Sequence, residues 1–402
     1  MSTLSERILG GMAGAFVDRE VDRAYAHDGT GVLTLEAWHA MGTNKIAFPE
    51  RVYILFDHIA PPNNSTTAAL QAELRKFAHS MDLHFCDVGG GICHQVMGER
   101  YALPGEIIVG ADSHTCTLGA FGAFATGVGA TDMAAIWVSG SSWFRVPETI
   151  GIHLNGNLNT PAEAKDLALT YVGLLGMDGA TYQALEFVGD GVADLSMDSR
   201  QTVSNLAVET GAKTGLFYAD HVTLRYLAES GLKPAVQEPE ECRYRREIDI
   251  DLENIEPVVA VPPRVDTVKP ASDLYGLPLD QVFIGTCTNG RYDDLRRLAE
   301  ILRGKKVRVR TVVAPASRDV LLRAVGTGVI ADIVQAGCVL LPPGCGPCLG
   351  AHMGVIGEGE VCLSTANRNF KNRMGVGGEI YLCSVATAAA SALAGELAGL
   401  EE

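Results

Sequence analysis

Residues 281–344 alternate between apolar runs and amphipathic segments, and this pattern constrains the fold more than any other part of the chain. The apolar runs are "QVFIGT", "KVRVRTVVA" and "GCVLLPPG", at residues 281–286, 306–314 and 337–344. The amphipathic segments between them are residues 291–304 and 317–328. In the first segment Leu295, Leu298 and Leu302 share one helical face, and Gly304 is a typical stop. The order strand, helix, strand, helix, strand predicts a parallel sheet covered by helices.

The same alternation is visible nearer the N-terminus. Residues 51–56, "RVYILF", and residues 106–115, "EIIVGADSHT", begin as buried-type strands. After the first of these runs we expect a helix. Its cap would come from Ser65, Thr66 or Thr67, and its apolar face would consist of Leu70, Leu74 and Phe77. The Gly/Ala-rich segment 119–135 predicts close packing rather than a phosphate loop.

A second region begins near Thr149, and a proline-bearing stretch at 256–272 is predicted to be a linker. The predicted fold class is therefore α/β. The predicted domains are three α/β units, at residues 1–147, 148–264 and 265–402.

Charge and length limit the possible functions. The chain has 402 residues, of which 47% are hydrophobic, enough for two or three domains with their own cores. A net charge of −16 makes it a poor general partner for nucleic acids or anionic membranes. No signal-peptide pattern and no apolar run of about 18 residues is present. We therefore expect a cytoplasmic protein whose ten cysteines stay reduced.

Three of these cysteines follow strands of the predicted parallel sheet. Cys287 lies in "GTCTNG", and Cys345 and Cys348 lie in "PGCGPCLG". Because the carboxyl ends of parallel strands share one edge, these thiols can converge. A single cysteine is ordinarily a small buried hydrophobic residue and not a ligand. We expect this packing role for Cys338, Cys362 and Cys383.

Three chemistries compete for the converging thiols. A structural zinc site needs four ligands, and the C-x2-C spacing has no second copy. A redox C-x-x-C pair normally opens a helix early in a small domain, not a Gly-Pro turn late in a long chain. Three thiolates suit a [4Fe–4S] cluster with one iron left open, which can act as a Lewis acid.

Seven ordered motifs extend this reading over nearly the whole chain. They are "FDH" (56–58), "GICHQ" (91–95), "GADSHTCT" (110–117), "SNLAVETGAKTG" (204–215), "GTCTNG" (285–290), "PGCGPCLG" (343–350) and "STANRNFKNRMG" (364–375). Together they resemble the aconitase superfamily, and within it the large subunits of the two-subunit isopropylmalate dehydratase and homoaconitase group. The resemblance implies three α/β/α domains around one [4Fe–4S] cluster, without the fourth, swivelling domain. It also implies a hydro-lyase that dehydrates and rehydrates a hydroxy di- or tricarboxylate, as in leucine biosynthesis.

The resemblance also implies roles for particular residues. The cluster ligands would be Cys287, Cys345 and Cys348, with Asn205 and Asn367 beside the cluster. Substrate would be bound by His27, Ser113, Arg368 and Arg373. The catalytic residues would be Asp57, His58, His94, Asp112, His114 and Glu209. A histidine made more basic by an adjacent carboxylate suits a general acid, and guanidinium forks suit carboxylates.

One departure from single-chain aconitases predicts a partner. Those proteins carry a "GSSRE"-like motif with a serine base on a swivelling domain, whereas this chain has "SGSSWFRV" at 139–146. We expect a small swivel-domain subunit to supply the base and part of the substrate pocket. The favoured substrate is isopropylmalate; homocitrate, dimethylmalate or citramalate are alternatives, and an RNA-binding regulator or a zinc structural protein are more distant ones.

Overall fold

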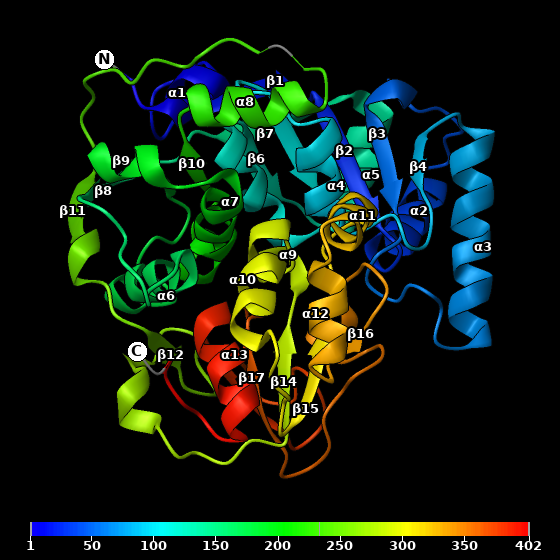
Figure 1. The fold of residues 1–402 in the computed structure, drawn as a ribbon. Helices are drawn as coiled ribbons and strands as arrows, with labels where there is room; N and C mark the ends of the chain where they lie inside the picture. The colour runs from blue at the N-terminus through cyan, green and yellow to red at the C-terminus, as the bar shows by residue number, and fades with distance from the viewer. Residues whose placement is uncertain (1, 233, 401–402) are drawn as a thin grey trace.

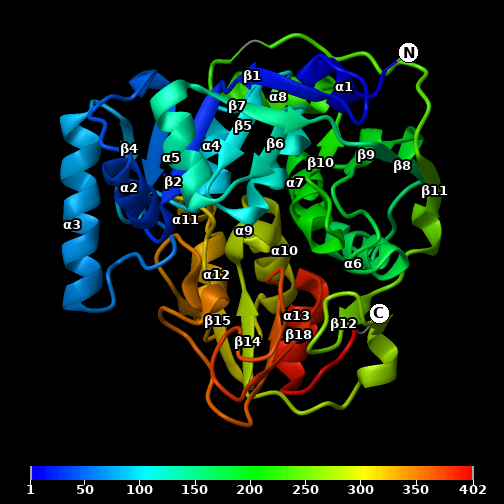
Figure 2. The same ribbon diagram turned by 180° about the vertical axis from the view of Figure 1, so that it is seen from behind.

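Three β-sheets and a small ribbon organise the structure, a computed structural model that describes residues 2–232 and 234–400. The third sheet lies below the other two in the view of Figure 1, in yellow to red. Figure 2 shows the same division from behind, with the N-terminus at the opposite side of the view. The described part of the chain contains no helix that is both long and apolar enough to cross a membrane.

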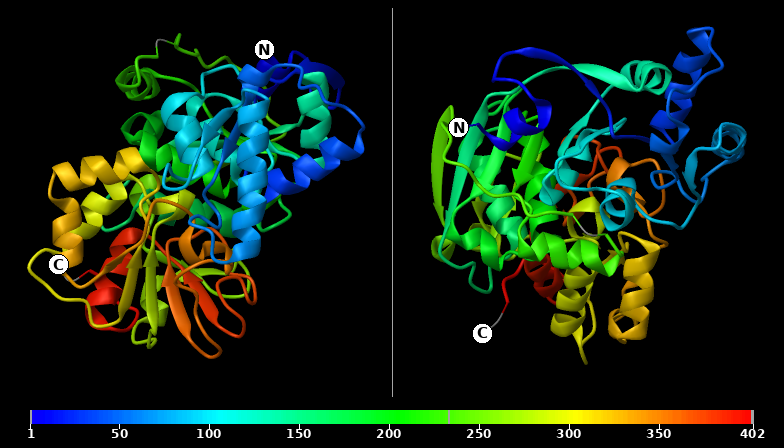
Figure 3. Two further views of the ribbon diagram at one scale, coloured as in Figure 1. Left: turned by 90° about the vertical axis from the view of Figure 1, so that its right-hand side faces the viewer. Right: turned by 90° about the horizontal axis from the view of Figure 1, so that it is seen from above.

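The first sheet is parallel throughout, in the order β4-β3-β2-β5-β6. Its strands are Arg23–His27 (β2), Val52–Leu55 (β3), His84–Cys86 (β4), Ile107–Gly110 (β5) and Phe124–Gly127 (β6). Its helices are Thr30–Ala40 (α2), Ser65–Ser80 (α3), Cys93–Arg100 (α4), Ala130–Ser139 (α5) and the 3-10 helix Ser113–Phe121 (η2). Helices α2, α3 and α5 share one buried core with the sheet, and α3 stands at the outer side of the molecule (Figure 3). Strands Phe16–Glu20 (β1) and Ser141–Arg145 (β7) form the separate antiparallel ribbon.

The second sheet is also parallel, in the order β10-β9-β8-β11. Its strands are Thr149–Asn155 (β8), Ala184–Val188 (β9), Thr214–Phe217 (β10) and Arg246–Asp251 (β11). The helices of this region are Ala164–Leu175 (α6), Met197–Asn205 (α7) and His221–Glu229 (α8), and the N-terminal helix Leu4–Leu9 (α1) reaches it as well. The core of this region continues into the inner face of the first sheet.

The third sheet has the order β13-β12-β18-β17-β14-β15-β16, and the five strands from β18 to β16 are parallel. Its strands are Val258–Ala260 (β12), Val268–Pro270 (β13), Gln281–Ile284 (β14), Arg310–Val313 (β15), Val339–Leu340 (β16), Val361–Ser364 (β17) and Glu379–Leu382 (β18). Its helices are Thr286–Asn289 (α9), Tyr292–Leu302 (α10), Arg318–Gly326 (α11), Val329–Gln335 (α12) and Val385–Ala394 (α13). The predicted alternation over 281–344 is confirmed, with Leu295, Leu298 and Leu302 buried on one face of α10.

Three local predictions were wrong. The stretch 256–272 is not a linker, because its buried valines form β12, which joins the third sheet ahead of the predicted limit at residue 264. Asn64 caps α3 in place of the following hydroxyl residues, since its side chain accepts from the Thr67 N–H at 2.9 Å. Leu70 is 38% exposed and lies off the apolar face that Leu74 and Phe77 form. The domain limits themselves stay a prediction.

Two other expectations are confirmed. Gly119, in the Gly/Ala-rich segment, lies so close to β10 that a Cβ atom there would collide with the carbonyl of Gly215. This is the close packing that small residues permit. Cys338, Cys362 and Cys383 are buried in the apolar core of the third sheet or beside it.

A buried carboxylate fastens α1 to the second sheet. Glu186, on the inner strand β9, accepts the backbone N–H groups of Leu4 at 2.7 Å and Ser5 at 3.3 Å. The hydroxyls of Tyr218 and Tyr244 donate to its other oxygen. Burial outweighs these hydrogen bonds and raises the pKa of Glu186 to about 7.

This pKa predicts a stability change with pH. Between about pH 4.5 and pH 7 the folded chain keeps a proton on Glu186 that the unfolded chain has lost, so the stability falls as pH rises. We expect Glu186→Gln to remove about 2–3 kcal/mol of this fall. Denaturant unfolding at several pH values measures the change in the free energy of unfolding. Glu247→Gln is the control, because Glu247 lies on β11 of the same sheet and its side chain is 60% exposed. Equal pH dependence in wild type and Glu186→Gln would contradict the assignment.

Candidate functional site

The carboxyl ends of the third sheet carry the predicted thiols. Cys287 follows β14, Cys345 and Cys348 follow β16, and Asn367 follows β17. Because β14, β16 and β17 run in the same direction, their following loops open on one edge of the sheet. Thr286, directly before Cys287, has a φ of +69°, a left-handed conformation that is strained for a β-branched residue.

The three thiols are buried, and two side-chain amides donate to the sulfur of one of them, Cys287. Cys287, Cys345 and Cys348 are 6–7% exposed, and each is a free thiol. The side-chain amides of Asn205 and Asn367 donate to the Cys287 sulfur at 3.2 and 3.4 Å. Burial raises the pKa of the Cys287 thiol to about 12 and also raises that of Cys345. A metal that takes these sulfurs as thiolates must therefore displace protons, and the amide N–H groups would stabilise the resulting charge.

This donor set fits an iron–sulfur group better than a zinc ion. Of the described residues, these three are the cysteines that line the cavity at the sheet edge. A closed structural zinc site needs four ligands, whereas a three-thiolate set leaves one iron of a [4Fe–4S] cluster open. Gly344, beside Cys345, approaches the carbonyl of Asp57 so closely that a Cβ atom would lie 2.9 Å from it.

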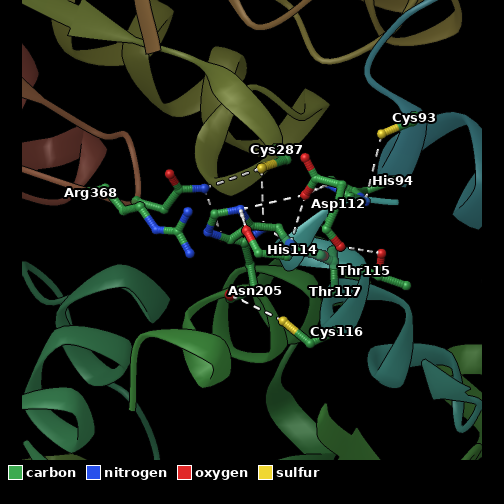
Figure 4. Close-up of polar contacts among 12 residues, drawn as sticks. Cys93, His94, Asp112, His114, Thr115, Cys116, Thr117, Asn205, Cys287 and Arg368 are labelled. Atoms are coloured by element: carbon green, nitrogen blue, oxygen red, sulfur yellow. Dashed lines mark hydrogen bonds and ion pairs between the residues drawn. The ribbon is translucent and has the colours of Figure 1, made fainter. Parts of the chain in front are cut away.

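Three carboxylate–imidazole pairs surround the same space. Their nitrogen–oxygen distances are 2.7 Å for His58 Nδ1 and Asp57 Oδ1, 3.0 Å for His94 Nε2 and Asp112 Oδ1, and 2.9 Å for His114 Nε2 and Glu209 Oε1. In the view of Figure 4, Asp112 and His114 lie below Cys287, and His94 lies to the right of Asp112. Paired imidazoles of this kind can exchange protons with a bound ligand.

Asp112 is the centre of this arrangement. Its Oδ1 also accepts the backbone N–H of His114 at 2.7 Å, and its Oδ2 lies 3.5 Å from His27 Nε2 and 3.4 Å from His58 Nε2. Burial alone would raise the pKa of Asp112, but the histidines, His94 above all, hold it well below its usual range. The rings of His27 and His58 stack with centroids 3.7 Å apart.

The pKa values of the histidines diverge. Burial lowers the pKa of His94, so its imidazole tends to be neutral. Burial opposes protonation of His58 as well, but its negatively charged partners, Cys345 as a thiolate, Asp57 and Asp112, outweigh it and raise its pKa well above the usual value. Such divergence separates a proton donor from a neutral, hydrogen-bonding imidazole.

Two arginines supply the local positive charge that a chain with a net charge of −16 needs in order to bind an anion. Arg368 donates from Nε to Glu209 Oε1 at 2.8 Å, which orients its guanidinium. Arg373 lies with its guanidinium carbon 5.2 Å from the centre of the Phe370 ring and one nitrogen 4.0 Å from the Cys348 sulfur. Both arginines line the cavity, so they can bind an anion there.

The cavity has a volume of about 370 Å³. The predicted residues that line it are His27, His58, His94, Asp112, Ser113, His114, Cys287, Cys345, Cys348, Asn367, Arg368 and Arg373. The other three, Asp57, Asn205 and Glu209, lie behind this wall and hydrogen-bond to residues in it. Larger cavities, of about 450 and 620 Å³, are lined by neither cysteine nor histidine in the described part of the chain.

Sequence reasoning missed two buried residues of the site. The Asp28 carboxylate accepts the backbone N–H groups of His58 at 2.9 Å and Ile59 at 2.8 Å, and so holds the turn that presents His58. Tyr25 hydrogen-bonds to His94. A weak signal existed for both, because residues 25 and 27 share one face of β2 and Asp28 follows His27 directly.

Three buried thiols, paired imidazoles and two guanidinium groups thus line one cavity, and this donor set fits a metal-containing group together with a small anion. The sequence model described as "Aconitase family (aconitate hydratase)" matches residues 6–275 and 264–395. The chain belongs to this family, and aconitate hydratase is a hydro-lyase.

Individual relatives cover almost the full chain. A protein of Methanosarcina mazei named "Probable methanogen homoaconitase large subunit" is 52% identical over 94% of this chain and 98% of its own length. A protein of Elusimicrobium minutum named "3-isopropylmalate dehydratase large subunit" is 46% identical over 100% of this chain and 99% of its own. The crystal structure of Thermococcus kodakaraensis aconitase X (holo-form) has a similar fold, with a TM-score of 0.53 and 14% identity, covering 87% of this chain and 84% of that one.

The thiol set can be tested through iron binding. We expect the anaerobically reconstituted chain to bind about four irons, and Cys345→Ser to lose most of them, because the change would remove one of three expected cluster ligands. Iron analysis and visible absorption measure this. Cys338→Ser is the matched control, since Cys338 is equally buried, at 6% exposure, but packs in the third sheet's core. Full iron content in Cys345→Ser would contradict the assignment.

Proposed function

We propose that this chain is the large subunit of a 3-isopropylmalate dehydratase, interconverting 2- and 3-isopropylmalate by loss and return of water. One observation carries the proposal. A single cavity combines three buried thiols, three carboxylate–imidazole pairs and two arginines in a chain 44–46% identical, over nearly its full length, to relatives that carry that name.

The proposed cofactor is one [4Fe–4S] cluster, held by Cys287, Cys345 and Cys348, with Asn205 and Asn367 donating to the sulfur of Cys287. When bound, its open iron acts as a Lewis acid toward a substrate hydroxyl and carboxylate. Binding of the substrate and transfer of protons would be carried out by the side chains around the cluster.

We assign binding of the substrate to one wall of the cavity and proton transfer to the other. Arg368 and Arg373 would hold carboxylate oxygens, with Ser113 and His27 completing the substrate contacts. His58, charged through Asp57, would give its proton to the leaving hydroxyl. Asp112 would stabilise that charged imidazole, while His94 and the His114–Glu209 pair position Asp112 and Arg368.

A small subunit completes the site in this proposal. The names of the relatives specify a large subunit, and we assign to the partner a swivelling domain that supplies the carbon base and covers the cavity. Leu349 lines the cavity and is 38% exposed, and Phe370, which is 48% exposed, lies against Arg373. These exposed apolar side chains offer contact area for the partner.

A homoaconitase large subunit is the second candidate, favoured by the 52% identical relative of that name. Homoaconitate has three carboxylates and isopropylmalate has two. Of the residues described along the cavity wall, two are arginines and none is a lysine, which matches two carboxylates. A third carboxylate would need a cation from the partner.

Activity of the separate and combined subunits tests the proposal. The chain alone should be nearly inactive on 2-isopropylmalate, because positioned proton transfer contributes about 10²- to 10⁴-fold. Adding a small-subunit partner should restore turnover, followed by the absorbance of the unsaturated intermediate. Homoaconitate in the same assay is the comparison. Faster turnover of homoaconitate would replace the first candidate by the second, and turnover by the large chain alone would contradict the two-subunit proposal.

Arg368→Lys should lower kcat/KM by roughly 10- to 150-fold, because lysine keeps the charge but loses the two-pronged bond, worth about 1.5–3 kcal/mol. Steady-state kinetics of the combined subunits measures the change. Arg303→Lys, at a side chain 65% exposed, is the control and should stay within about twofold. The same small effect for Arg368→Lys would place the substrate away from Arg368.

A further inference from the structure

Lys165, in the first turn of α6, is a buried cation behind the cavity. Its side chain is fully buried, although a positive charge is unfavourable both away from water and at the N-terminal end of a helix. Burial lowers the pKa of Lys165 to about 8, so most of the molecules keep this charge at pH 7. The contacts of the ammonium group must therefore offset two unfavourable terms.

Those contacts are two consecutive backbone carbonyls of the third sheet region. Lys165 Nζ donates to the carbonyl of Thr365 at 2.8 Å and to that of Ala366 at 2.6 Å, which uses two of its three N–H groups. The N–H groups of the same two residues are bound within the third region, by the Phe283 carbonyl and the Ser364 hydroxyl, each at 3.0 Å. Lys165 thus satisfies the carbonyls of a buried turn, and a buried carbonyl without a donor would be unfavourable.

The two residues that follow this turn belong to the candidate site. The Asn367 amide donates to the Cys287 sulfur at 3.4 Å, and Arg368 lines the cavity. A shift of the peptides at 365 and 366 would move both side chains, because they leave the chain one and two residues further on. Lys165 stands on a helix of the second region, so it restrains this turn from outside the sheet that carries it.

We propose that Lys165 is a positioning residue that holds the peptides of Thr365 and Ala366, and thereby sets Asn367 against the Cys287 sulfur and directs Arg368 into the cavity. Its effect passes through the backbone of the turn. The role requires N–H donors at the end of a long side chain, and the volume of the side chain alone does not supply them.

Binding of Co²⁺ to the full-length, metal-free chain tests the thiol side of the proposal. Thiolate-to-cobalt charge-transfer absorption reports sulfur ligation, and Cys345→Ser shows how much of it comes from the three thiols. Loss of an outer hydrogen-bond partner lowers metal affinity about 10- to 100-fold, so Lys165→Met, which keeps the volume but removes both donors, should weaken cobalt binding at least about tenfold. If Lys165→Met does not fold, Lys165→Gln, which is uncharged and one bond shorter, carries the same measurement. Wild-type affinity in the folded variant would overturn the proposal.

A double-mutant cycle with Asn367→Ala separates positioning from general destabilisation. If Lys165 acts through Asn367, Lys165→Met should weaken cobalt binding by less than about threefold in a chain that already lacks the Asn367 amide. Equal losses in both backgrounds would overturn the proposal. Asp166→Asn is the matched control, because Asp166 is the next residue of α6, is equally buried, and accepts the N–H groups of Glu163 and Val258. A loss in Asp166→Asn as large as in Lys165→Met would count against the role of Lys165.

The consequence for Arg368 rests on the proposed function, whereas cobalt binding does not. In the combined subunits Lys165→Met should lower kcat/KM about tenfold, the size expected for one lost charged hydrogen bond. A wild-type complex that turns over neither isopropylmalate nor homoaconitate would refute the proposed function and leave cobalt binding to decide on Lys165. Weakened cobalt binding with wild-type kcat/KM would overturn the link from Lys165 to Arg368. A wild-type chain without sulfur-bound cobalt would refute the thiol site and the role of Lys165 together.

Discussion

The geometry of the cavity depends on one buried cation, Arg291, at the place where the three sheets meet. Its guanidinium donates to the carbonyls of Cys287 and Thr288, to Gln95 on α4 and to Thr202 on α7. A buried guanidinium costs several kcal/mol unless its donors are satisfied, so these contacts have to form together. Arg291 thereby ties the loop that carries Cys287 to helix α4, on which His94 precedes Gln95, and fixes the Cys287 thiol relative to the His94 imidazole.

Each sheet region contributes a different part of the cavity as a consequence. The first brings the imidazoles and Asp112, and the third brings the thiols and arginines. The second contributes from behind, through Asn205 toward the sulfur of Cys287 and Glu209 toward His114 and Arg368. Since Glu209 bonds both of these side chains, it couples the two opposite walls. No region holds the whole proposed site, so correct packing of all three is a condition for function.

The sequence alone predicted the parts of this arrangement that follow from local pattern. The alternation over 281–344 predicted the parallel sheet, and the shared edge of that sheet predicted that Cys287 and Cys345 converge. Contacts between distant residues were beyond such reasoning. Tyr25 and His94 are 69 positions apart, and nothing in a strand of alternating residues indicates which side chain a buried tyrosine meets. Prolines made 256–272 resemble a linker, although burial of Val258 and Val259 in the third sheet outweighs them. The prediction that Asp112 and Glu209 belong to the site came from the family resemblance and not from a local sequence pattern.

The charged side chains around the cavity would orient a bound anion. The chain carries a net charge of −16, yet Arg368 and Arg373 stand together on one wall while the Asp112 carboxylate stands among histidines on the other. A carboxylate is attracted to the first wall and repelled by the second, so a hydroxy acid would enter with its hydroxyl toward His58. Glu209 takes the Nε of Arg368 and offsets part of its charge, which limits how tightly the ground-state carboxylate is held. On this argument Glu209 orients Arg368 and moderates its charge, although it lies behind the cavity wall.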